Sequence, residues 1–150
     1  MKILFLHGLE SKPGGPKPTF LANYGYDIVE PALPKDNWNA SVKIARETFK
    51  QEHPDAVVGS SRGAAVAIAA DLPTRKLVLI APAWRKYCSS CTVPSTAVIL
   101  HSPYDNIISF SDSELLAEES GANLIEVGVN HRMNDENTFQ ELIQAINKAN

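Results

Sequence analysis

Residues 55–64 of the sequence read Asp-Ala-Val-Val-Gly-Ser-Ser-Arg-Gly-Ala, and they decide how the rest of the chain is interpreted. The stretch places Gly59-x-Ser61-x-Gly63 between an apolar run and an alanine-rich run. This order predicts a strand, a sharp turn and a helix, because small residues two positions from the serine let neighbouring backbones pass closely. Such a turn presents the Ser61 hydroxyl as a nucleophile. The alternative interpretation makes Ser61 only the N-cap of the helix.

Short apolar runs alternate with helical patterns along the whole chain. Such alternation is typical of an α/β domain with a mainly parallel sheet. Strands are expected at residues 2–6, 27–30, 56–58, 76–81, 96–100 and 123–127. Several of these runs are continuously apolar, as in strands that are covered on both faces. Because right-handed crossovers place helices on both faces, we predict a three-layer α/β/α sandwich with six mainly parallel strands in the order 2-1-3-4-5-6.

Helices are indicated where apolar residues recur every three or four positions. One such face comprises Trp38, Val42, Ala45 and Phe49, and another comprises Phe139, Leu142, Ile143 and Ile146. The Ser111-x-x-Glu114 pattern predicts a capping box for a further helix, which Gly121 ends. The residues after Gly63 are apolar nearly all round, so their helix is expected to be the buried central one.

Two stretches carry little sign of regular structure. Residues 11–18 combine two glycines with three prolines and predict a mobile surface loop. Their glycines form neither a Gly-x-Gly-x-x-Gly pattern nor a P-loop pattern. Residues 82–94 join two expected strands and have little helical character.

Length and composition favour one domain over residues 1–150. Hydrophobic residues make up 44% of the 150 residues, which is ordinary for a compact domain with one core. The 14 Lys and Arg against 17 Asp and Glu give a net charge of −3, and no basic cluster points to a nucleic-acid partner. The early apolar run at 3–6 is too short for a signal peptide or a membrane span. The sequence therefore predicts a cytoplasmic protein without a membrane partner.

Cys88 and Cys91 form a single Cys-x-x-Cys pattern. A zinc site would need two further ligands at suitable spacing, and the sequence has neither a second cysteine pair nor a closely spaced histidine pair. A thioredoxin-type motif would lie where a strand turns into a helix, whereas this pattern lies in a serine-rich stretch that Pro94 closes. We expect two reduced thiols outside the chemistry, with oxidation after purification as the alternative.

Three further stretches of the sequence contain histidine residues, and one of them also contains an aspartate. Residues 4–9 read Leu-Phe-Leu-His-Gly-Leu, residues 101–105 read His-Ser-Pro-Tyr-Asp, and residues 129–133 read Val-Asn-His-Arg-Met. Together with the stretch around Ser61, they make the sequence resemble the serine hydrolases of the α/β-hydrolase fold. The resemblance spans residues 2–146 and is strongest to small bacterial esterase-like members. It implies a minimal α/β-hydrolase domain over the whole chain, without a cap domain.

The resemblance implies a catalytic triad of Ser61, Asp105 and His131, separated by 44 and then 26 residues. A serine hydroxyl needs a base within hydrogen-bond reach, and an imidazole at position 131 suits that role. Asp105 would hold His131 in the tautomer that leaves one ring nitrogen free for Ser61. The candidates for the oxyanion hole are the backbone N–H of Leu9, in the His-Gly loop, and that of Arg62, at the start of the helix.

Other polar residues near these positions are candidates for more than one role. Asp112 competes with Asp105 as the acid, but its capping context at a helix start favours Asp105. His101 ends a strand at the same sheet edge and is a candidate for lining the substrate site. The Arg62 side chain is expected either to pair with a local acid or to face an anionic substrate.

The sequence thus predicts a serine hydrolase that cleaves a small ester or a related acyl bond through an acyl-serine intermediate, with no cofactor and no metal. The alternatives are a catalytically silent hydrolase-like fold that binds a small molecule or a protein, and a thiol-redox or metal protein that uses its two cysteines. A silent relative is expected to lack a triad member, and none is missing here. Without a cap domain the pocket should be open, with Trp84 and Tyr87 supplying one apolar wall.

The pattern predicts that Ser61, and not its neighbour Ser60, is the nucleophile, because only Ser61 has a glycine two residues away on both sides. A fluorophosphonate probe should label the wild-type protein and Ser60→Ala but leave Ser61→Ala unlabelled. Labelling that persists in Ser61→Ala would overturn this assignment.

Overall fold

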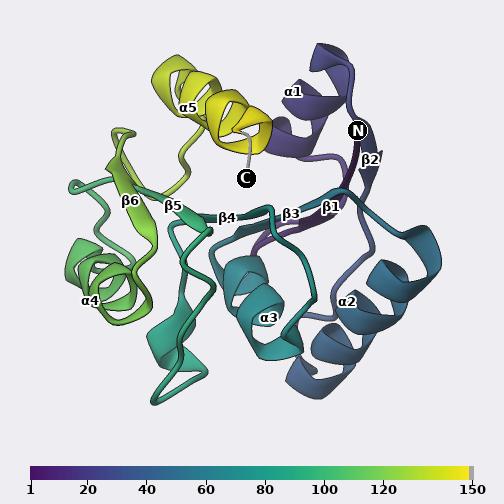
Figure 1. The fold of residues 1–150 in the computed structure, drawn as a ribbon, viewed down its shortest axis with the longest axis horizontal. Helices are drawn as coiled ribbons and strands as arrows, with labels where there is room; N and C mark the ends of the chain where they lie inside the picture. Colours follow the sequence, from purple (N-terminus) through teal and green to yellow (C-terminus); the bar gives the residue numbers. More distant parts are fainter. Residues whose placement is uncertain (149–150) are drawn as a thin grey trace.

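The computed structural model describes residues 1–148 and consists of a parallel sheet between two layers of helices (Figure 1). The strands are β1 (Lys2–Leu6), β2 (Asp27–Val29), β3 (Ala56–Ser60), β4 (Leu77–Ile80), β5 (Val98–His101) and β6 (Asn123–Glu126). The helices are α1 (Pro16–Tyr24), α2 (Trp38–Glu52), α3 (Arg62–Ala70), α4 (Phe110–Ser120) and α5 (Glu136–Asn147), with a short 3-10 turn, η1 (Trp84–Lys86). Every predicted strand is present, with ends that differ by one or two residues.

The sheet has six strands in the order β2-β1-β3-β4-β5-β6, and every neighbouring pair is parallel. The predicted order and the predicted α/β/α sandwich are confirmed. The strand order reverses beside β1, so the carboxyl ends of β1 and β3 diverge around the place where parallel sheets bind ligands. The Ser61 turn follows β3 at this edge.

Two apolar cores lie on the two faces of the sheet. Leu4 and Leu6 of β1 face α2 and α3, while Ile3 and Phe5 of the same strand face α1 and α5. This alternation follows from the two-residue period of a strand, and the same strand therefore serves both cores. In Figure 1, α1 and α5 lie above the sheet, and α2, α3 and α4 lie below it.

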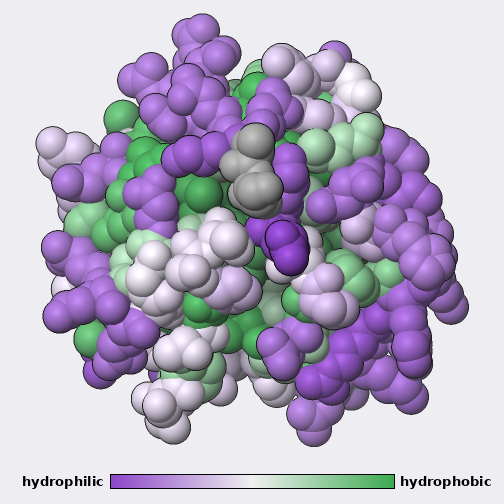
Figure 2. Space-filling model, viewed as in Figure 1, coloured by the Kyte–Doolittle hydropathy of each residue, from purple (hydrophilic) through white to green (hydrophobic). Residues whose placement is uncertain are grey.

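The outer surfaces of the helices are hydrophilic. On the face shown in Figure 2, hydrophilic side chains cover the outward sides of α2 and α5, and apolar residues show between the elements. The predicted apolar faces of these two helices point inward: Val42 and Ala45 of α2 are buried, as are Leu142 and Ile146 of α5. Within residues 1–148, none of the helices combines the length and apolar character needed to cross a bilayer.

The start of α1 differs from the sequence prediction. The helix begins at Pro16, inside the stretch 11–18 that was predicted to be a loop, so only its first half is irregular. Proline fits the first turn of a helix because the N–H that it lacks would have no acceptor there. Lys17, in the same turn, is buried.

The start of α4 also differs. The N-cap residue is Ser109 and its side chain makes no capping bond, while Ser111 lies inside the first turn. The predicted capping box is therefore wrong. Gly121 ends the helix in the left-handed conformation, as predicted. Residues 82–94 have little helical character, apart from η1.

The glycines on either side of Ser61 are required by close packing. A Cβ atom at Gly63 would lie 2.0 Å from the Leu6 carbonyl oxygen, and one at Gly59 would lie 2.7 Å from Ala64 Cα. The start of α3 therefore lies directly against the end of β1, and any side chain at position 63 would push the two apart.

We predict that Gly63→Ala destabilises the fold by about 3 kcal/mol or more, because overpacking against backbone cannot be relieved by rotating a side chain. The control is Gly15→Ala, where the nearest heavy atom to the new Cβ would be 3.9 Å away. Chemical denaturation should show a large loss for the first variant and little change for the second. Equal stabilities would contradict the close packing of α3 against β1.

Candidate active site

Ser61 lies on a strained turn between β3 and α3. Its φ of 54° and ψ of −114° fall outside the regions that non-glycine residues usually adopt. The turn is held from both sides: the Ser61 N–H donates to the Ile80 carbonyl at 2.8 Å, and the Ser61 carbonyl accepts from Ala64 and Ala83 at 3.1 Å. These bonds fix the backbone in a conformation that costs about 1 to 3 kcal/mol.

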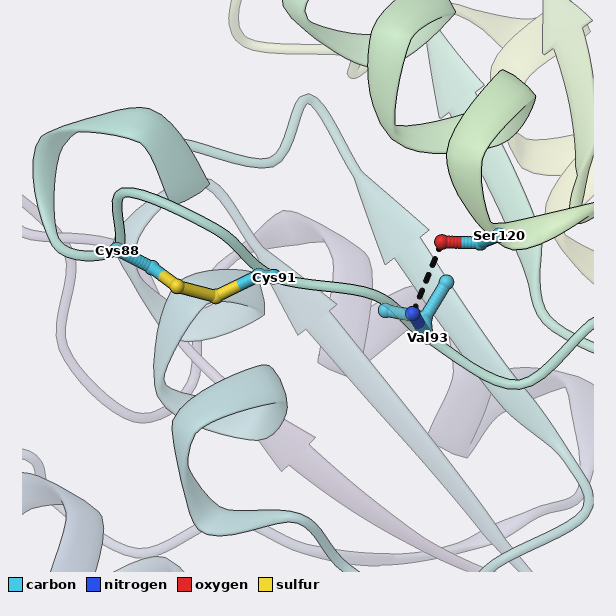
Figure 3. The surroundings of a disulfide bond; sticks show 4 residues. All are labelled: Cys88, Cys91, Val93 and Ser120. Carbon is cyan, nitrogen blue, oxygen red and sulfur yellow. Dashed lines mark hydrogen bonds between the residues drawn. A yellow bond between two sulfur atoms is a disulfide. The ribbon is translucent and has the colours of Figure 1, made fainter.

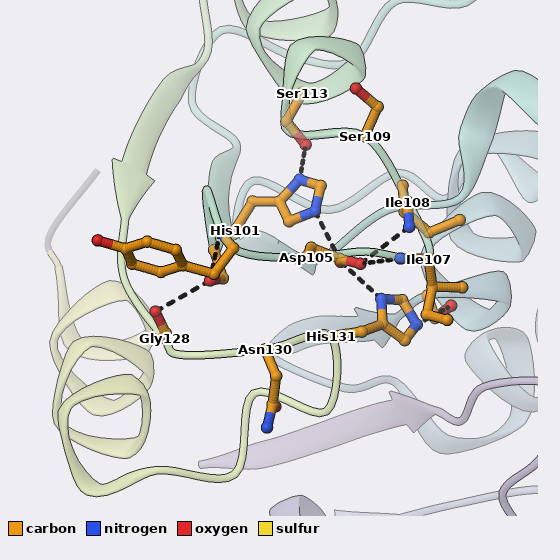
Figure 4. A network of polar contacts seen from close by, with 12 residues as sticks. His101, Asp105, Ile107, Ile108, Ser109, Ser113, Gly128, Asn130 and His131 are labelled. Carbon is orange, nitrogen blue, oxygen red and sulfur yellow. Dashed lines mark hydrogen bonds and ion pairs between the residues drawn. The ribbon is translucent and has the colours of Figure 1, made fainter.

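A chain of hydrogen bonds runs from Ser61 into the protein. Ser61 Oγ lies 3.0 Å from His131 Nε2, and His131 Nδ1 lies 2.6 Å from Asp105 Oδ2. Asp105 follows β5 and His131 follows β6, so neighbouring strands bring the two loops together (Figure 4). The structure thus places the three residues of the predicted triad in contact, in the expected order. Asp112, the competing acid, instead contacts Arg85 at 3.2 Å.

The carboxylate of Asp105 is fully buried and fully hydrogen-bonded. Its Oδ1 accepts from the N–H groups of Ile107 at 2.8 Å and Ile108 at 2.9 Å, and its Oδ2 faces two imidazoles. Burial raises the pKa of Asp105, but the N–H of Ile108, the imidazoles of His131 and His101 and the N–H of Ile107 together lower it below its usual value. Asp105 is therefore an anion at neutral pH.

His101 is not a substrate-lining residue, because its side chain has no exposed surface. Its Nε2 lies 2.9 Å from Asp105 Oδ2, and its Nδ1 lies 2.6 Å from Ser113 Oγ (Figure 4). Burial lowers the pKa of His101 although Asp105 opposes this shift, so the ring is neutral at neutral pH. In the neutral tautomer that satisfies both contacts, Nε2–H donates to Asp105 and Nδ1 accepts from Ser113. Sequence reasoning missed this second imidazole behind the acid.

The two candidate oxyanion donors lie at the same edge of the sheet. A Cβ atom at Gly8 would lie 3.5 Å from Ser61 Cβ, so the loop that carries Leu9 packs against the turn. The Leu9 N–H donates to no other group in the described chain. Arg62 is the first residue of α3, where an N–H has no acceptor within the helix and the helix dipole favours negative charge. Their role in binding an oxyanion remains a prediction.

The Arg62 side chain neither pairs with an acid nor faces the site. It is buried, and one terminal nitrogen donates to the Pro34 carbonyl at 3.0 Å and to Ser41 Oγ at 3.1 Å. The guanidinium also lies 5.5 Å from the centre of the Trp38 ring. Both expectations for this side chain are wrong, because neutral acceptors and an aromatic face in α2 and the segment before it take the place of a carboxylate.

Trp84 and Tyr87 do not form a wall beside Ser61. Trp84 is 2% exposed and its ring N–H donates to the Asp112 carbonyl at 2.9 Å, while Tyr87 stacks on Trp38 at 4.2 Å. Both line a cavity of about 100 Å³ against the side of α3, and neither Ser61 nor His131 lines it. The predicted wall is wrong because Trp84 is buried in the core below the sheet, and Tyr87, which is 37% exposed, packs on Trp38 of α2.

Cys88 and Cys91 are joined in a disulfide, with their Cα atoms 6.1 Å apart (Figure 3). This contradicts the expectation of two reduced thiols and matches the oxidised alternative. Just beyond the bridge, the Val93 N–H donates to Ser120 Oγ at 2.9 Å, which ties the segment to the end of α4 (Figure 3). Within residues 1–148, no group of three or more His, Cys, Asp or Glu side chains is arranged to hold a metal ion.

Two residues of the amino-terminal region shape the site. His7 Nδ1 contacts the Gly8 carbonyl at 2.8 Å, and its Nε2 accepts from the Leu33 N–H at 3.0 Å, so this ring braces the loop before Leu9. Lys17 Nζ donates to the Arg132 carbonyl and to Asn134 Oδ1, next to His131. Burial lowers the pKa of Lys17 to about 8, against the opposing charge of Asp135.

Solved structures resemble this one over almost their whole length. A protein of the alpha/beta hydrolase superfamily from Xanthomonas campestris matches with a TM-score of 0.78 and 23% identity, covering 96% of this chain and 98% of its own. The mouse alpha/beta hydrolase domain-containing protein 10 matches with a TM-score of 0.73 and 16% identity, covering 97% of this chain and 87% of its own. An alpha/beta hydrolase enzyme from a lagoon-sediment metagenome of Mar Chica, Morocco, matches with a TM-score of 0.72 and 17% identity. The match covers 96% of this chain and 89% of that enzyme.

The chain has the α/β-hydrolase fold. No protein-family model matches the sequence, and neither does any curated protein. The likeness therefore lies in the backbone arrangement, since the three structures above are only 16–23% identical to this chain. Within this fold, Ser61 lies on the sharp turn between β3 and α3.

We predict that His101 positions the Asp105 carboxylate through its Nε2–H. In His101→Leu the anion loses one of four donors, so the pKa of Asp105, followed by the pH dependence of its carboxyl resonance in NMR, should rise by about one unit. His101→Gln keeps an N–H donor and should restore most of the shift. An Asp105 pKa that stays unchanged in His101→Leu, with the fold intact by circular dichroism, would contradict this role.

Proposed function

We propose that the protein is a serine hydrolase that cleaves small esters or related acyl bonds, with Ser61 as nucleophile, His131 as base and Asp105 as acid. The observation that carries this proposal is the continuous chain of hydrogen bonds from Ser61 Oγ through His131 to a buried carboxylate. A hydroxyl on a strained turn that contacts an imidazole, itself oriented by a carboxylate, is the arrangement that activates a serine.

The first half of the reaction transfers the acyl group to the protein. Ser61 Oγ attacks the acyl carbon while His131 Nε2 takes the hydroxyl proton, and the carbonyl oxygen becomes an oxyanion. The N–H groups of Leu9 and Arg62 are the proposed donors to that oxyanion. When the bond to the leaving group breaks, the alcohol takes the proton from His131, and the acyl group remains on Ser61.

The second half returns the protein to its starting state. Water attacks the acyl carbon and gives a proton to His131, and the resulting oxyanion occupies the same site. Collapse of this intermediate releases the carboxylic acid and returns the proton to Ser61 Oγ. Throughout both halves the anionic Asp105 stabilises the imidazolium without accepting its proton.

The comparisons support this proposal at the level of the fold. Similar structures include an alpha/beta hydrolase enzyme, Est1E from Butyrivibrio proteoclasticus and an esterase domain of a Rhodothermus marinus protein. The same fold hosts many chemistries, so the arrangement of side chains supports the reaction more strongly than the likeness does.

The cavity beside the turn is small, about 40 Å³, and it bears on the acyl length that the protein accepts. Each buried methylene adds roughly 0.8 kcal/mol of binding, but only while the chain is enclosed. We predict that kcat/KM for p-nitrophenyl esters peaks between acetyl and butyryl and falls by octanoyl.

The matched controls are Ser61→Ala, which should lose at least about a thousandfold in kcat, and Asp112→Asn, which should retain activity. A steady rise through dodecanoyl esters would contradict the open site. Wild-type rates in Ser61→Ala would contradict the proposed reaction itself.

A further inference from the structure

A small cavity, lined by apolar and polar residues, adjoins the Ser61 turn on the α1 side of the sheet. Its lining includes Gly8, which packs against Ser61, and Ser60, which directly precedes it. Ser11, Lys12 and Glu30 are further polar residues of the lining. The cavity of about 40 Å³ has room for about three water-sized groups, and so for one small substituent of a substrate.

Glu30 brings an unused acceptor to this cavity. Its Oε1 accepts from the Gly14 N–H at 2.8 Å, but its Oε2 is buried and has no hydrogen-bond partner in the described residues. Burial raises the pKa of Glu30 although the Gly14 N–H opposes the shift, which marks a partly desolvated carboxyl. A buried acceptor without a partner is costly, so this oxygen is set to receive a donor from outside the chain.

Ser60 also lines the cavity and carries a hydroxyl. Side chains alternate along β3, and Ala56 and Val58 belong to the core beneath α1 and α5, so Ser60 points to that same face. Within the described chain, the Ser60 hydroxyl makes no hydrogen bond. An acceptor and a free hydroxyl therefore line one cavity beside the nucleophile.

The charges around the cavity select against a cationic ligand. Lys12 and Lys17 line it together with Glu30, and the ammonium group of a ligand would be repelled by both lysines. Lys17 Nζ is already engaged with the Arg132 carbonyl and Asn134. A neutral group that both donates and accepts fits these walls better than an amine or a carboxylate does.

We propose that this cavity binds a hydroxyl group of the substrate, which donates to Glu30 Oε2 and accepts from Ser60 Oγ. The inference rests on the proposed function, and it narrows the substrate class to short esters that carry a hydroxyl on either the acyl or the alcohol portion. A site built to hydrogen-bond a hydroxyl discriminates against the analogue without it, because its own polar groups are then left unpaired.

Matched ester pairs test the preference, and each pair replaces one hydroxyl by a methyl group. The acyl pair is p-nitrophenyl 3-hydroxypropanoate against p-nitrophenyl butanoate, and the alcohol pair is 2-hydroxyethyl butyrate against propyl butyrate. In the wild type, the ratio of kcat/KM within at least one pair should favour the hydroxylated ester by about tenfold. The pair that shows the preference identifies which portion of the substrate the cavity takes.

Variants assign the preference to the cavity. Glu30→Gln keeps the shape but loses the anion, and Ser60→Ala removes the free hydroxyl, so both should lower the ratio toward one. Glu10→Gln is the control, since Glu10 lies on the surface and pairs with Lys35 at 3.0 Å, and it should keep the wild-type ratio. A wild-type ratio near one, or a ratio that neither Glu30→Gln nor Ser60→Ala changes, overturns the proposal.

A binding measurement separates this inference from the proposed reaction. In Ser61→Ala, which cannot form the acyl intermediate, 2-hydroxyethyl butyrate or methyl 3-hydroxypropanoate should shift the NMR amide resonance of Gly14, while propyl butyrate should not. If the wild type hydrolyses no ester, the proposed function fails and this titration alone decides the role of the cavity. An unshifted Gly14 resonance with both hydroxylated esters then overturns it.

Discussion

The contact between the start of α3 and the end of β1 is the constraint on which the site depends. Only a residue without a side chain fits at position 63, where a Cβ would meet the Leu6 carbonyl at 2.0 Å. This approach forces Ser61 into its strained conformation and brings the Gly8 loop against it. The packing of α3 against β1 therefore places both the proposed nucleophile and the adjacent N–H groups.

A buried anion organises the other half of the site. Four N–H donors surround Asp105, two from backbone and two from imidazoles, and they keep it ionised in a place from which water is excluded. The parallel pairing of β5 and β6 places the Asp105 and His131 loops side by side. Because Lys17 donates to the carbonyl of Arg132, next to His131, the amino-terminal helix α1 also helps to position the proposed base.

The fold was predictable because several strands are continuous apolar runs. The contact among Ser61, Asp105 and His131 was predictable because these residues follow strand ends at one edge of the sheet. The start of α1 could not be predicted from the sequence, because prolines usually indicate a loop although they also fit the first turn of a helix. The sequence could not predict that Trp84 is buried, or which groups the side chains of Arg62 and His101 contact. These positions depend on tertiary contacts between distant segments, which no local sequence pattern encodes.

The most direct test of the central claim is to trap the covalent intermediate. Mixing the protein with p-nitrophenyl acetate should give a burst of close to one p-nitrophenol per chain, and mass spectrometry of the quenched protein should locate an acetyl group on Ser61. His131→Ala should abolish the burst, since the hydroxyl then has no base. An acetyl group on another residue, or a burst that persists in His131→Ala, would contradict the account of this site.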